Sequence, residues 1–340
     1  MAEVEDKLVF LVSAPRSGST LLARMLGAHS RVAGGPEPHL ISPLAHLGYY
    51  ERVDSAPYDP VIAQRGIREL IARLPGGEED FLAACRAYTD HLYARWLESA
   101  PGKSLLLDKT PAYALVLPFL TRLYPRARYV VLTRSPLAVL SSYANSFYDG
   151  DFEVSVRHNP ILERYVPAIA RFLREAPAPL IHVRYEPLVE SPGSELERLC
   201  GFLDLEFEPA AIEYGGAQGE PTAHKRGLGD PLGVERHSRP VTDSVDSWAD
   251  ELASDAQRRE VALRTLDRLD DADLETWGYR RQQILDALHE AAPSAVPRRR
   301  PLSRYVLERK LLVGLRRNIQ TNAFGRLVRR IRLLCDVLLR

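Results

Sequence analysis

Four short, mainly apolar runs divide this chain, and each has the length of a strand; the first and third also have the continuous hydrophobicity of a buried parallel strand. The runs lie at residues 8–12, 104–107, 129–133 and 180–185. Behind the first run, apolar side chains return at helical spacing at Leu21, Leu22, Met25 and Leu26. Strands that alternate with helices predict an α/β fold, a doubly wound parallel sheet flanked by helices. Ligands bind at the carboxyl ends of the strands in such sheets, so functional residues are expected in the turns that follow the runs.

The turn after the first run is small, polar and contains one glycine. Residues 13–20 read SAPRSGST, and the helical pattern begins directly behind them. A strand that enters a helix through such a turn directs free backbone N–H groups and the positive end of the helix at one point, which suits a phosphate or sulfate. A loop for nucleoside triphosphates, GxxxxGK(S/T), would place a lysine at Ser19, whereas the only cation here is Arg16. An ordinary serine-rich turn and a degenerate kinase or nucleotide triphosphatase loop remain the alternatives.

A second charged turn follows the third apolar run. Arg134 stands at the end of that run, Pro136 suits the first turn of a helix, and Ser142 follows farther along the same helix. The spacing from Arg134 to Ser142 is a little over two helical turns, so the serine is expected to lean back over the end of the strand. Taken alone, Arg134 could be a helix-end ion-pairing residue and Ser142 a surface hydroxyl.

The two turns together resemble the sulfotransferases that use 3′-phosphoadenylyl sulfate (PAPS). In that family a loop commonly written P(K/R)SG(S/T)T binds the 5′-phosphosulfate, and an Arg and a Ser at this spacing hold the 3′-phosphate. The resemblance runs from about residue 7 to residue 250 and implies a P-loop-like fold. The nucleotide-binding residues that it implies are Arg16, Ser17, Gly18, Ser19, Thr20, Arg134, Ser142, Tyr185 and Arg239. A core tyrosine would look the same as Tyr185, and Arg239 comes from one of two basic clusters that compete to cover the nucleotide.

The loop behind the first helix carries a single carboxylate between prolines, in the segment Pro36-Glu37-Pro-His39-Leu. Sulfuryl transfer requires a base for the proton of the acceptor hydroxyl, and a carboxylate in a dehydrated cleft can act as one because desolvation raises its pKa. The segment resembles those of heparan-type and tyrosylprotein sulfotransferases and of sulfotransferase domains in olefin-forming polyketide synthases, which implies that Glu37 is the base. A surface carboxylate is the alternative interpretation, and His39 is a second candidate base.

The segment after the second run, Asp108-Lys109-Thr-Pro-Ala-Tyr113, resembles the EKTPxY motif of the heparan-type enzymes, with Asp in place of Glu. The resemblance implies that Lys109, together with Arg16, stabilises negative charge on the leaving phosphate. A plain ion pair with Asp108 is the alternative. His237, in one of the basic clusters, is a candidate second proton-transfer group. It lacks partners at metal-binding spacing, and we predict no metal site.

Composition agrees with a globular enzyme. The chain has 340 residues, of which 45% are hydrophobic and 26% charged, and one domain over residues 1–290 is expected to hold every motif. The three cysteines are scattered through the chain and suit reduced thiols. The start of the chain lacks the features of a signal peptide, and no stretch is apolar enough to cross a bilayer. We therefore expect a cytoplasmic protein.

The net charge of zero conceals an asymmetry. Residues 293–340 hold 13 Arg or Lys and 2 Asp or Glu, a net charge of +11, whereas the rest of the chain holds 32 basic and 43 acidic residues, a net charge of −11. Residues 291–300 read as a linker, and residues 301–340 as a basic amphipathic helical tail. The tail could pack on the acidic body or in a homodimer, lie on an anionic membrane surface, or dock a partner protein. Nucleic acid is not expected, because no stacking aromatics alternate with the arginines.

These features predict an enzyme that transfers a sulfuryl group from PAPS to a hydroxyl of a small molecule, a sugar or a carrier-bound metabolite, including a β-hydroxyacyl chain on a carrier protein. In-line attack with Glu37 as the base is expected, without a metal. Two alternatives stay open. A P-loop kinase or nucleotide triphosphatase would require acidic ligands for Mg²⁺, and the sequence has no convincing Walker B strand. A non-catalytic scaffold that docks on membranes through its tail would tolerate the loss of Glu37.

Overall fold

A computed structural model describes residues 2–35, 37–45, 60–216 and 238–291, together with Leu327 and Ile331. Three sequence-based predictions fall outside this part of the chain: His237, the linker beyond Ala291, and the tail at 301–340 apart from those two residues. None of the helices in the described ranges combines the length and the apolar character that a membrane span requires.

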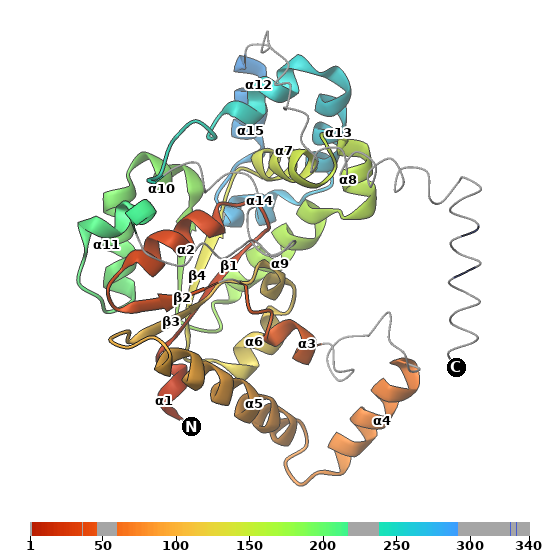
Figure 1. The fold of residues 1–340 in the computed structure, drawn as a ribbon. Helices are drawn as coiled ribbons and strands as arrows, with labels where there is room; N and C mark the ends of the chain where they lie inside the picture. The colour runs from red at the N-terminus through yellow and green to blue at the C-terminus, as the bar shows by residue number, and fades with distance from the viewer. Residues whose placement is uncertain are drawn as a thin grey trace.

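Five parallel strands form one sheet in the order β2-β3-β1-β4-β5 (Figure 1). The strands are β1 (Leu8–Ser13), β2 (Val32–Gly34), β3 (Leu105–Asp108), β4 (Arg128–Thr133) and β5 (Leu180–Arg184). The four predicted strands are confirmed. The apolar pattern does not predict β2, because the segment Val-Ala-Gly is too short to produce a periodic signal.

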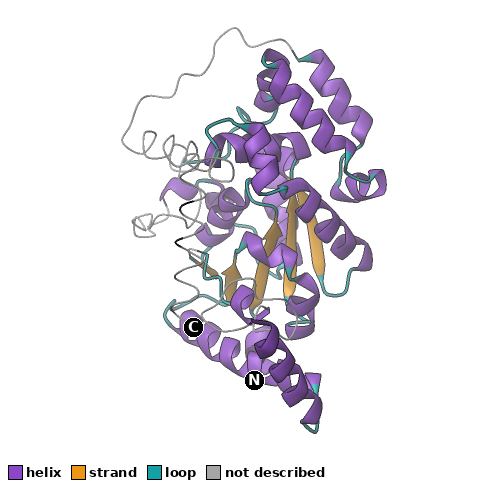
Figure 2. Ribbon diagram, turned by 90° about the vertical axis from the view of Figure 1, so that its right-hand side faces the viewer, coloured by secondary structure: helices purple, strands orange, loops and turns teal. Residues whose placement is uncertain are grey.

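Helices cover both faces of this sheet (Figure 2). In the described ranges they are α1 (Ala2–Glu5), α2 (Ser19–Ala28), α3 (Ile41–Ala45), α4 (Pro60–Arg73), α5 (Glu78–Glu98), η1 (Pro111–Leu115), α6 (Leu117–Leu123), α7 (Pro136–Phe147), α8 (Phe152–His158), α9 (Ile161–Glu175), α10 (Tyr185–Glu190), α11 (Pro192–Phe202), η2 (Pro209–Ile212), η3 (Tyr214–Gly216), α12 (Ser247–Ser254), α13 (Ala256–Asp267), α14 (Asp271–Trp277) and α15 (Arg281–Glu290).

The strands bury two separate cores, one on each face of the sheet. Along β1, Phe10 and Val12 join a core that includes residues of α5, α6, α7 and α9, whereas Val9 and Leu11 join a second core with α2, α10 and α11. This division follows from the geometry of a strand, in which successive side chains point to opposite faces. Burial on both faces also explains why β1 and β4 read as nearly continuous apolar runs, whereas the edge strand β5, which is only partly buried, includes His182 and Arg184. The predicted α/β class with a doubly wound parallel sheet is confirmed.

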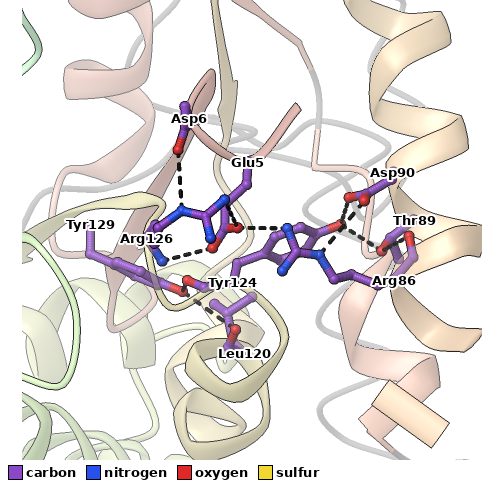
Figure 3. Close-up of polar contacts among 9 residues, drawn as sticks. All are labelled: Glu5, Asp6, Arg86, Thr89, Asp90, Leu120, Tyr124, Arg126 and Tyr129. Carbon is purple, nitrogen blue, oxygen red and sulfur yellow. Dashed lines mark hydrogen bonds and ion pairs between the residues drawn. The ribbon is translucent and has the colours of Figure 1, made fainter. Parts of the chain in front are cut away.

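A buried acidic residue ties the beginning of the chain to the amino-terminal edge of the sheet (Figure 3). Glu5 is fully buried, and its carboxylate lies 2.6 Å from a guanidinium nitrogen of Arg86 on α5 and 2.9 Å from one of Arg126. It also accepts a hydrogen bond from the Arg126 backbone N–H at 2.7 Å. Beside it, the Tyr124 hydroxyl donates to Asp90 at 2.8 Å. Because Arg126 lies two residues before β4, this network fixes how α1, α5 and β4 meet.

Replacing Glu5 with alanine should lower the free energy of unfolding by about 2 kcal/mol, because one backbone N–H loses its acceptor and two arginines lose their shorter ion pair, while Arg86 keeps Asp90 and Arg126 keeps Asp6. For a domain of this size the melting temperature should fall by roughly 4 °C. Thermal unfolding followed by circular dichroism measures the effect. Asp6→Asn is the control, since that carboxylate is exposed and we expect it to change stability by less than about 0.5 kcal/mol. Equal effects of the two substitutions would contradict this account.

Candidate active site

The sequence-predicted motifs meet at the carboxyl-terminal edge of the sheet because all five strands run in the same direction. Residues 14–18 follow β1, the Glu37 loop follows β2, Lys109 follows β3, Arg134 follows β4, and Tyr185 follows β5. β1 lies in the middle of the sheet, where the connections switch from one side to the other. A crevice forms at such a switch point in open α/β sheets, and it is the usual place for a ligand.

The turn between β1 and α2 has the backbone of an anion-binding loop. Gly18 caps α2 with φ at 95°, and Arg16 also adopts a left-handed conformation, with φ at 71°. A non-glycine residue pays about 1 kcal/mol or more for that conformation, which is common at functional sites. Ser13 and Ser17 are fully buried, and within the described ranges their hydroxyls have no hydrogen-bond partner. Buried polar groups are normally paired, so these hydroxyls fit a polar ligand held in the turn.

Arg134 connects this turn to the end of β4. Its side chain is buried and donates to the Arg16 carbonyl at 3.3 Å and to the Ser244 carbonyl at 2.6 Å. The guanidinium also lies over the Tyr185 ring, 4.2 Å from the centroid. Burial lowers the pKa of Arg134, and the nearby Tyr185 and Glu186 oppose that effect. The structure thus places a preorganised, desolvated cation directly beside the turn.

Ser142 and Tyr185 lie on either side of this arginine. The Ser142 hydroxyl, on α7, accepts a hydrogen bond from Arg16 Nε at 3.1 Å, so the helix does lean back over the turn. Tyr185 packs beneath Gly18, and its hydroxyl is 2.7 Å from that of Ser244. One face of the Tyr185 ring is covered by the Arg134 guanidinium, which is a positioning contact rather than a free stacking surface.

Distant residues support the Arg134 turn, and sequence reasoning did not assign them this role. Trp277, at the end of α14, donates its indole N–H to the Arg134 carbonyl at 2.8 Å. Glu186 accepts a hydrogen bond from the Ser135 backbone N–H at 3.2 Å, and its other oxygen accepts one from the Tyr279 hydroxyl. Glu186 directly follows the predicted nucleotide-binding residue Tyr185 in the chain, so the sequence could have indicated it. No sequence pattern indicated Trp277, Tyr279 or Ser244, because their contacts with the end of β4 exist only in the folded chain.

Glu37 and Lys109 form an ion pair that joins the ends of β2 and β3. The Glu37 carboxylate lies 2.5 Å from Lys109 Nζ, and both side chains are largely buried, with exposed fractions of 12% and 6%. The His39 imidazole lies 3.4 Å from the second carboxylate oxygen and is far more exposed. The cation therefore pairs with the carboxylate of the proline-flanked loop. The ion pair with Asp108, which was the alternative for Lys109, is not what the structure shows.

Asp108 instead accepts hydrogen bonds from three hydroxyl groups. Tyr93 donates at 2.7 Å, and Thr110 and Tyr113 donate at 3.1 Å each. Burial raises the pKa of Asp108 to about 6, against the opposing effect of these hydrogen bonds and of Lys109. Burial also raises the pKa of Tyr93 and of Tyr113, so both phenols stay protonated and can donate.

The remaining predicted residues are Ser19, Thr20, Arg239 and His237. Ser19 and Thr20 open α2 directly behind Gly18. The Arg239 guanidinium is mostly exposed and lies 3.6 Å from Glu213, while its carbonyl accepts a hydrogen bond from Tyr214. His237 lies outside the described residues. The structure therefore brings together Arg16, Ser142, Arg134 and Tyr185, and, separately, Glu37 with Lys109.

Comparison with known proteins agrees with this arrangement. A family model described as "Sulfotransferase family" matches residues 9–209, which include nearly the whole sheet. The nodulation protein NoeE of Sinorhizobium fredii is 32% identical over 267 residues, covering 72% of this chain and 60% of that protein. A putative protein-tyrosine sulfotransferase of Caenorhabditis briggsae is 27% identical over 212 residues, covering 62% of this chain and 69% of that protein.

A solved structure supports the fold independently. The sulfotransferase domain from the curacin biosynthetic pathway superimposes with a TM-score of 0.50 at 24% sequence identity, covering 75% of this chain and 96% of that domain. The chain spans less than two thirds of NoeE, so the similarity applies to the shared region. Because the family model matches more than half of the residues and includes the turns after β1 and β4, the chain belongs to the sulfotransferase family.

Proposed function

We propose that this protein transfers a sulfuryl group from PAPS to a hydroxyl group of a small molecule, a sugar or a carrier-bound metabolite. The observation that carries the proposal is the hydrogen bond from Arg134 to the Arg16 carbonyl, since it joins the turn after β1 to the turn after β4. A nucleotide with phosphate groups on both the 3′ and the 5′ positions of its ribose matches two adjacent anion sites, one in the turn after β1 and one in the turn after β4. The orphaned hydroxyls of Ser13 and Ser17 support a ligand rich in acceptor oxygens.

The residues that would hold the nucleotide follow from this arrangement. The backbone N–H groups at the start of α2, with Ser17, Ser19 and Thr20, suit the 5′ end, because a helix N-terminus favours negative charge. Arg134 and Ser142 suit the 3′-phosphate. PAPS, when bound, supplies the activated sulfuryl group. Tyr185 holds Gly18 and Arg134 in place, and Arg239 is a weaker candidate because its guanidinium lies beside Glu213.

Glu37 and Lys109 provide the acid–base and electrostatic parts of the mechanism. The Glu37 carboxylate, paired with Lys109 at 2.5 Å, can accept the proton of the acceptor hydroxyl as the hydroxyl oxygen bonds to sulfur. Once Glu37 is neutral, Lys109 loses its partner and can stabilise the negative charge that the broken sulfur–oxygen bond leaves on the phosphate, together with Arg16. His39, 3.4 Å from Glu37, is the second candidate base, and His237 is a candidate second proton-transfer group.

Calorimetric titration tests the nucleotide assignment. The wild-type protein should bind 3′,5′-ADP, the product that PAPS leaves behind, more tightly than ATP with Mg²⁺. Incubation with radiolabelled PAPS and a panel of acceptors then tests transfer, using a tyrosine peptide, a simple sugar, p-nitrophenol and a β-hydroxyacyl carrier protein. A preference for ATP with Mg²⁺ would support a kinase or triphosphatase instead. Binding of neither nucleotide would support a scaffold.

Location and domain division belong to the same proposal. We infer a cytoplasmic enzyme with a catalytic domain at 1–290, a linker at 291–300 and a basic tail at 301–340 that contacts a membrane surface, a partner protein or a second copy of the chain. The buried free thiols of Cys85 and Cys200 support a reducing compartment, and the opposite charges of the tail and the body support a separate role for the tail.

Replacing Gly18 with alanine should weaken 3′,5′-ADP binding at least about tenfold, because alanine disfavours positive φ by roughly 1 kcal/mol and would displace Tyr185 as well. A Cβ at this position would lie 2.4 Å from Tyr185 Cδ2, and the ring cannot retreat easily while Arg134 and Ser244 hold it. Calorimetry measures the affinity. Gly27→Ala on the same helix is the matched control, because its Cβ would meet open space and binding should be unchanged. Unaltered binding by Gly18→Ala would contradict the assignment of this turn.

A further inference from the structure

Asp108 is the most deeply buried carboxylate near the site, and the proposed mechanism does not use it. It closes β3, is 1% exposed, and accepts hydrogen bonds from Tyr93, Thr110 and Tyr113. Moving a carboxylate out of water has a large free-energy cost, even when donors compensate for part of it. A fully buried carboxylate at a strand end next to Lys109 therefore calls for a specific role.

The two tyrosines that donate to Asp108 lead to different parts of the protein. Tyr93 belongs to α5, on the flank of the sheet. Tyr113 belongs to η1, and its hydroxyl also accepts a hydrogen bond from the backbone N–H of Ile41 at 3.1 Å. Ile41 is the first residue of α3 and follows the loop that carries Glu37. One hydroxyl group therefore connects the Asp108 carboxylate to the end of the Glu37 loop.

The Glu37 loop is consequently held by two contacts that both originate at the end of β3. Lys109, the neighbour of Asp108 in the chain, forms the ion pair with Glu37, and Tyr113 holds Ile41. Thr110 adds a third constraint, since its hydroxyl donates to Asp108 and its carbonyl accepts from the Tyr113 N–H at 3.0 Å. The segment from Asp108 to Tyr113 thus folds around the carboxylate.

We propose that Asp108 is a positioning residue that, through the Tyr113 hydroxyl, sets where Glu37 lies relative to Lys109. The inference rests on the proposed function, because it assigns Asp108 to the alignment of the same base and cation. Alignment matters because displacing a reacting group by about 1 Å can lower a rate on the order of 100-fold, and supporting hydrogen bonds are what hold such groups in place. The Asp108 carboxylate and the Tyr113 hydroxyl are not among the groups assigned to the nucleotide, so 3′,5′-ADP affinity should change little when either is replaced.

The test compares two tyrosine-to-phenylalanine substitutions that each remove one hydrogen bond to Asp108. Tyr113→Phe breaks the link to Ile41, whereas Tyr93→Phe leaves that link intact. The release of 3′,5′-ADP from PAPS is measured with the most active acceptor of the panel. The affinity for 3′,5′-ADP is measured by calorimetry. We expect Tyr113→Phe to lower kcat about tenfold or more and to alter the pH profile of kcat, with unchanged nucleotide affinity. Tyr93→Phe should lower the melting temperature but keep kcat and its pH profile.

Asp108→Asn addresses the carboxylate itself. It should lower kcat in the same way, and adding Tyr113→Phe to it should lower kcat little further, because both changes break one connected unit. A crystal structure of Tyr113→Phe should show Glu37 displaced from Lys109. Equal kinetics of Tyr113→Phe and Tyr93→Phe, or an undisturbed ion pair in that crystal structure, would overturn the proposal. Failure of the proposed function would look different: the wild-type protein itself would bind no 3′,5′-ADP and release none from PAPS.

Discussion

Replacing Glu37 with glutamine should lower kcat for sulfuryl transfer about 1,000-fold while leaving 3′,5′-ADP affinity unchanged. The amide keeps the shape of the side chain but cannot accept the proton of the acceptor hydroxyl. Nucleotide affinity should be retained because the binding residues surround the turns after β1 and β4, whereas Glu37 follows β2. Steady-state rates of 3′,5′-ADP release from PAPS measure kcat, and calorimetry of the same preparations measures nucleotide affinity.

His39→Gln is the matched control for this prediction. His39 lies in the same loop and 3.4 Å from Glu37, but it is largely exposed, so the substitution should lower kcat no more than a few-fold if Glu37 is the base. A large loss in His39→Gln with little loss in Glu37→Gln would exchange the two roles. If neither substitution changed the rate of 3′,5′-ADP release from PAPS, the assignment of a base to this loop would be wrong.

The sequence predicted β1, β3 and β4 well because parallel strands buried on both faces have an apolar residue at nearly every position. Val9 is buried in the core on one face of the sheet and Phe10 in the core on the other face, so both positions are apolar. β2 escaped prediction because its three residues include a glycine and precede a proline-rich loop. The position of the site was predictable for a related reason, since in a parallel sheet the turn after every strand lies at the same edge.

The parts of the site that depend on tertiary contacts were not predictable. The sequence placed Asp108 beside Lys109 and left an ion pair between them open, but Asp108 is the last residue of β3 and Lys109 begins the turn that follows it. Lys109 therefore reaches Glu37, and Asp108 turns to the tyrosines. In the same way, no local pattern connects Trp277 with Arg134, whose carbonyl it contacts from α14. Local motifs identify the groups that act, whereas the residues that hold them are found only in the fold.

Replacing Arg134 with alanine should weaken 3′,5′-ADP binding at least about 100-fold, because charge-assisted hydrogen bonds from a buried guanidinium contribute roughly 1.5–3 kcal/mol each. Lysine should not restore binding. The guanidinium spans the Arg16 and Ser244 carbonyls while its flat face lies on Tyr185, and an ammonium group can match neither the fork nor the stacking. Calorimetry of wild type, Arg134→Ala and Arg134→Lys measures the loss.

Arg239→Ala decides whether this loss reflects the specific site or a general loss of positive charge. Both substitutions remove one cation, yet the Arg239 side chain is exposed and lies beside Glu213, so screening by solvent and salt should limit its effect to a few-fold. Circular dichroism must show that Arg134→Ala remains folded, since Arg134 also anchors the Ser244 segment. If Arg239→Ala lost binding and Arg134→Ala kept it, the 3′-phosphate would belong to the basic cluster around Arg239, and the turn after β4 would have only a structural role.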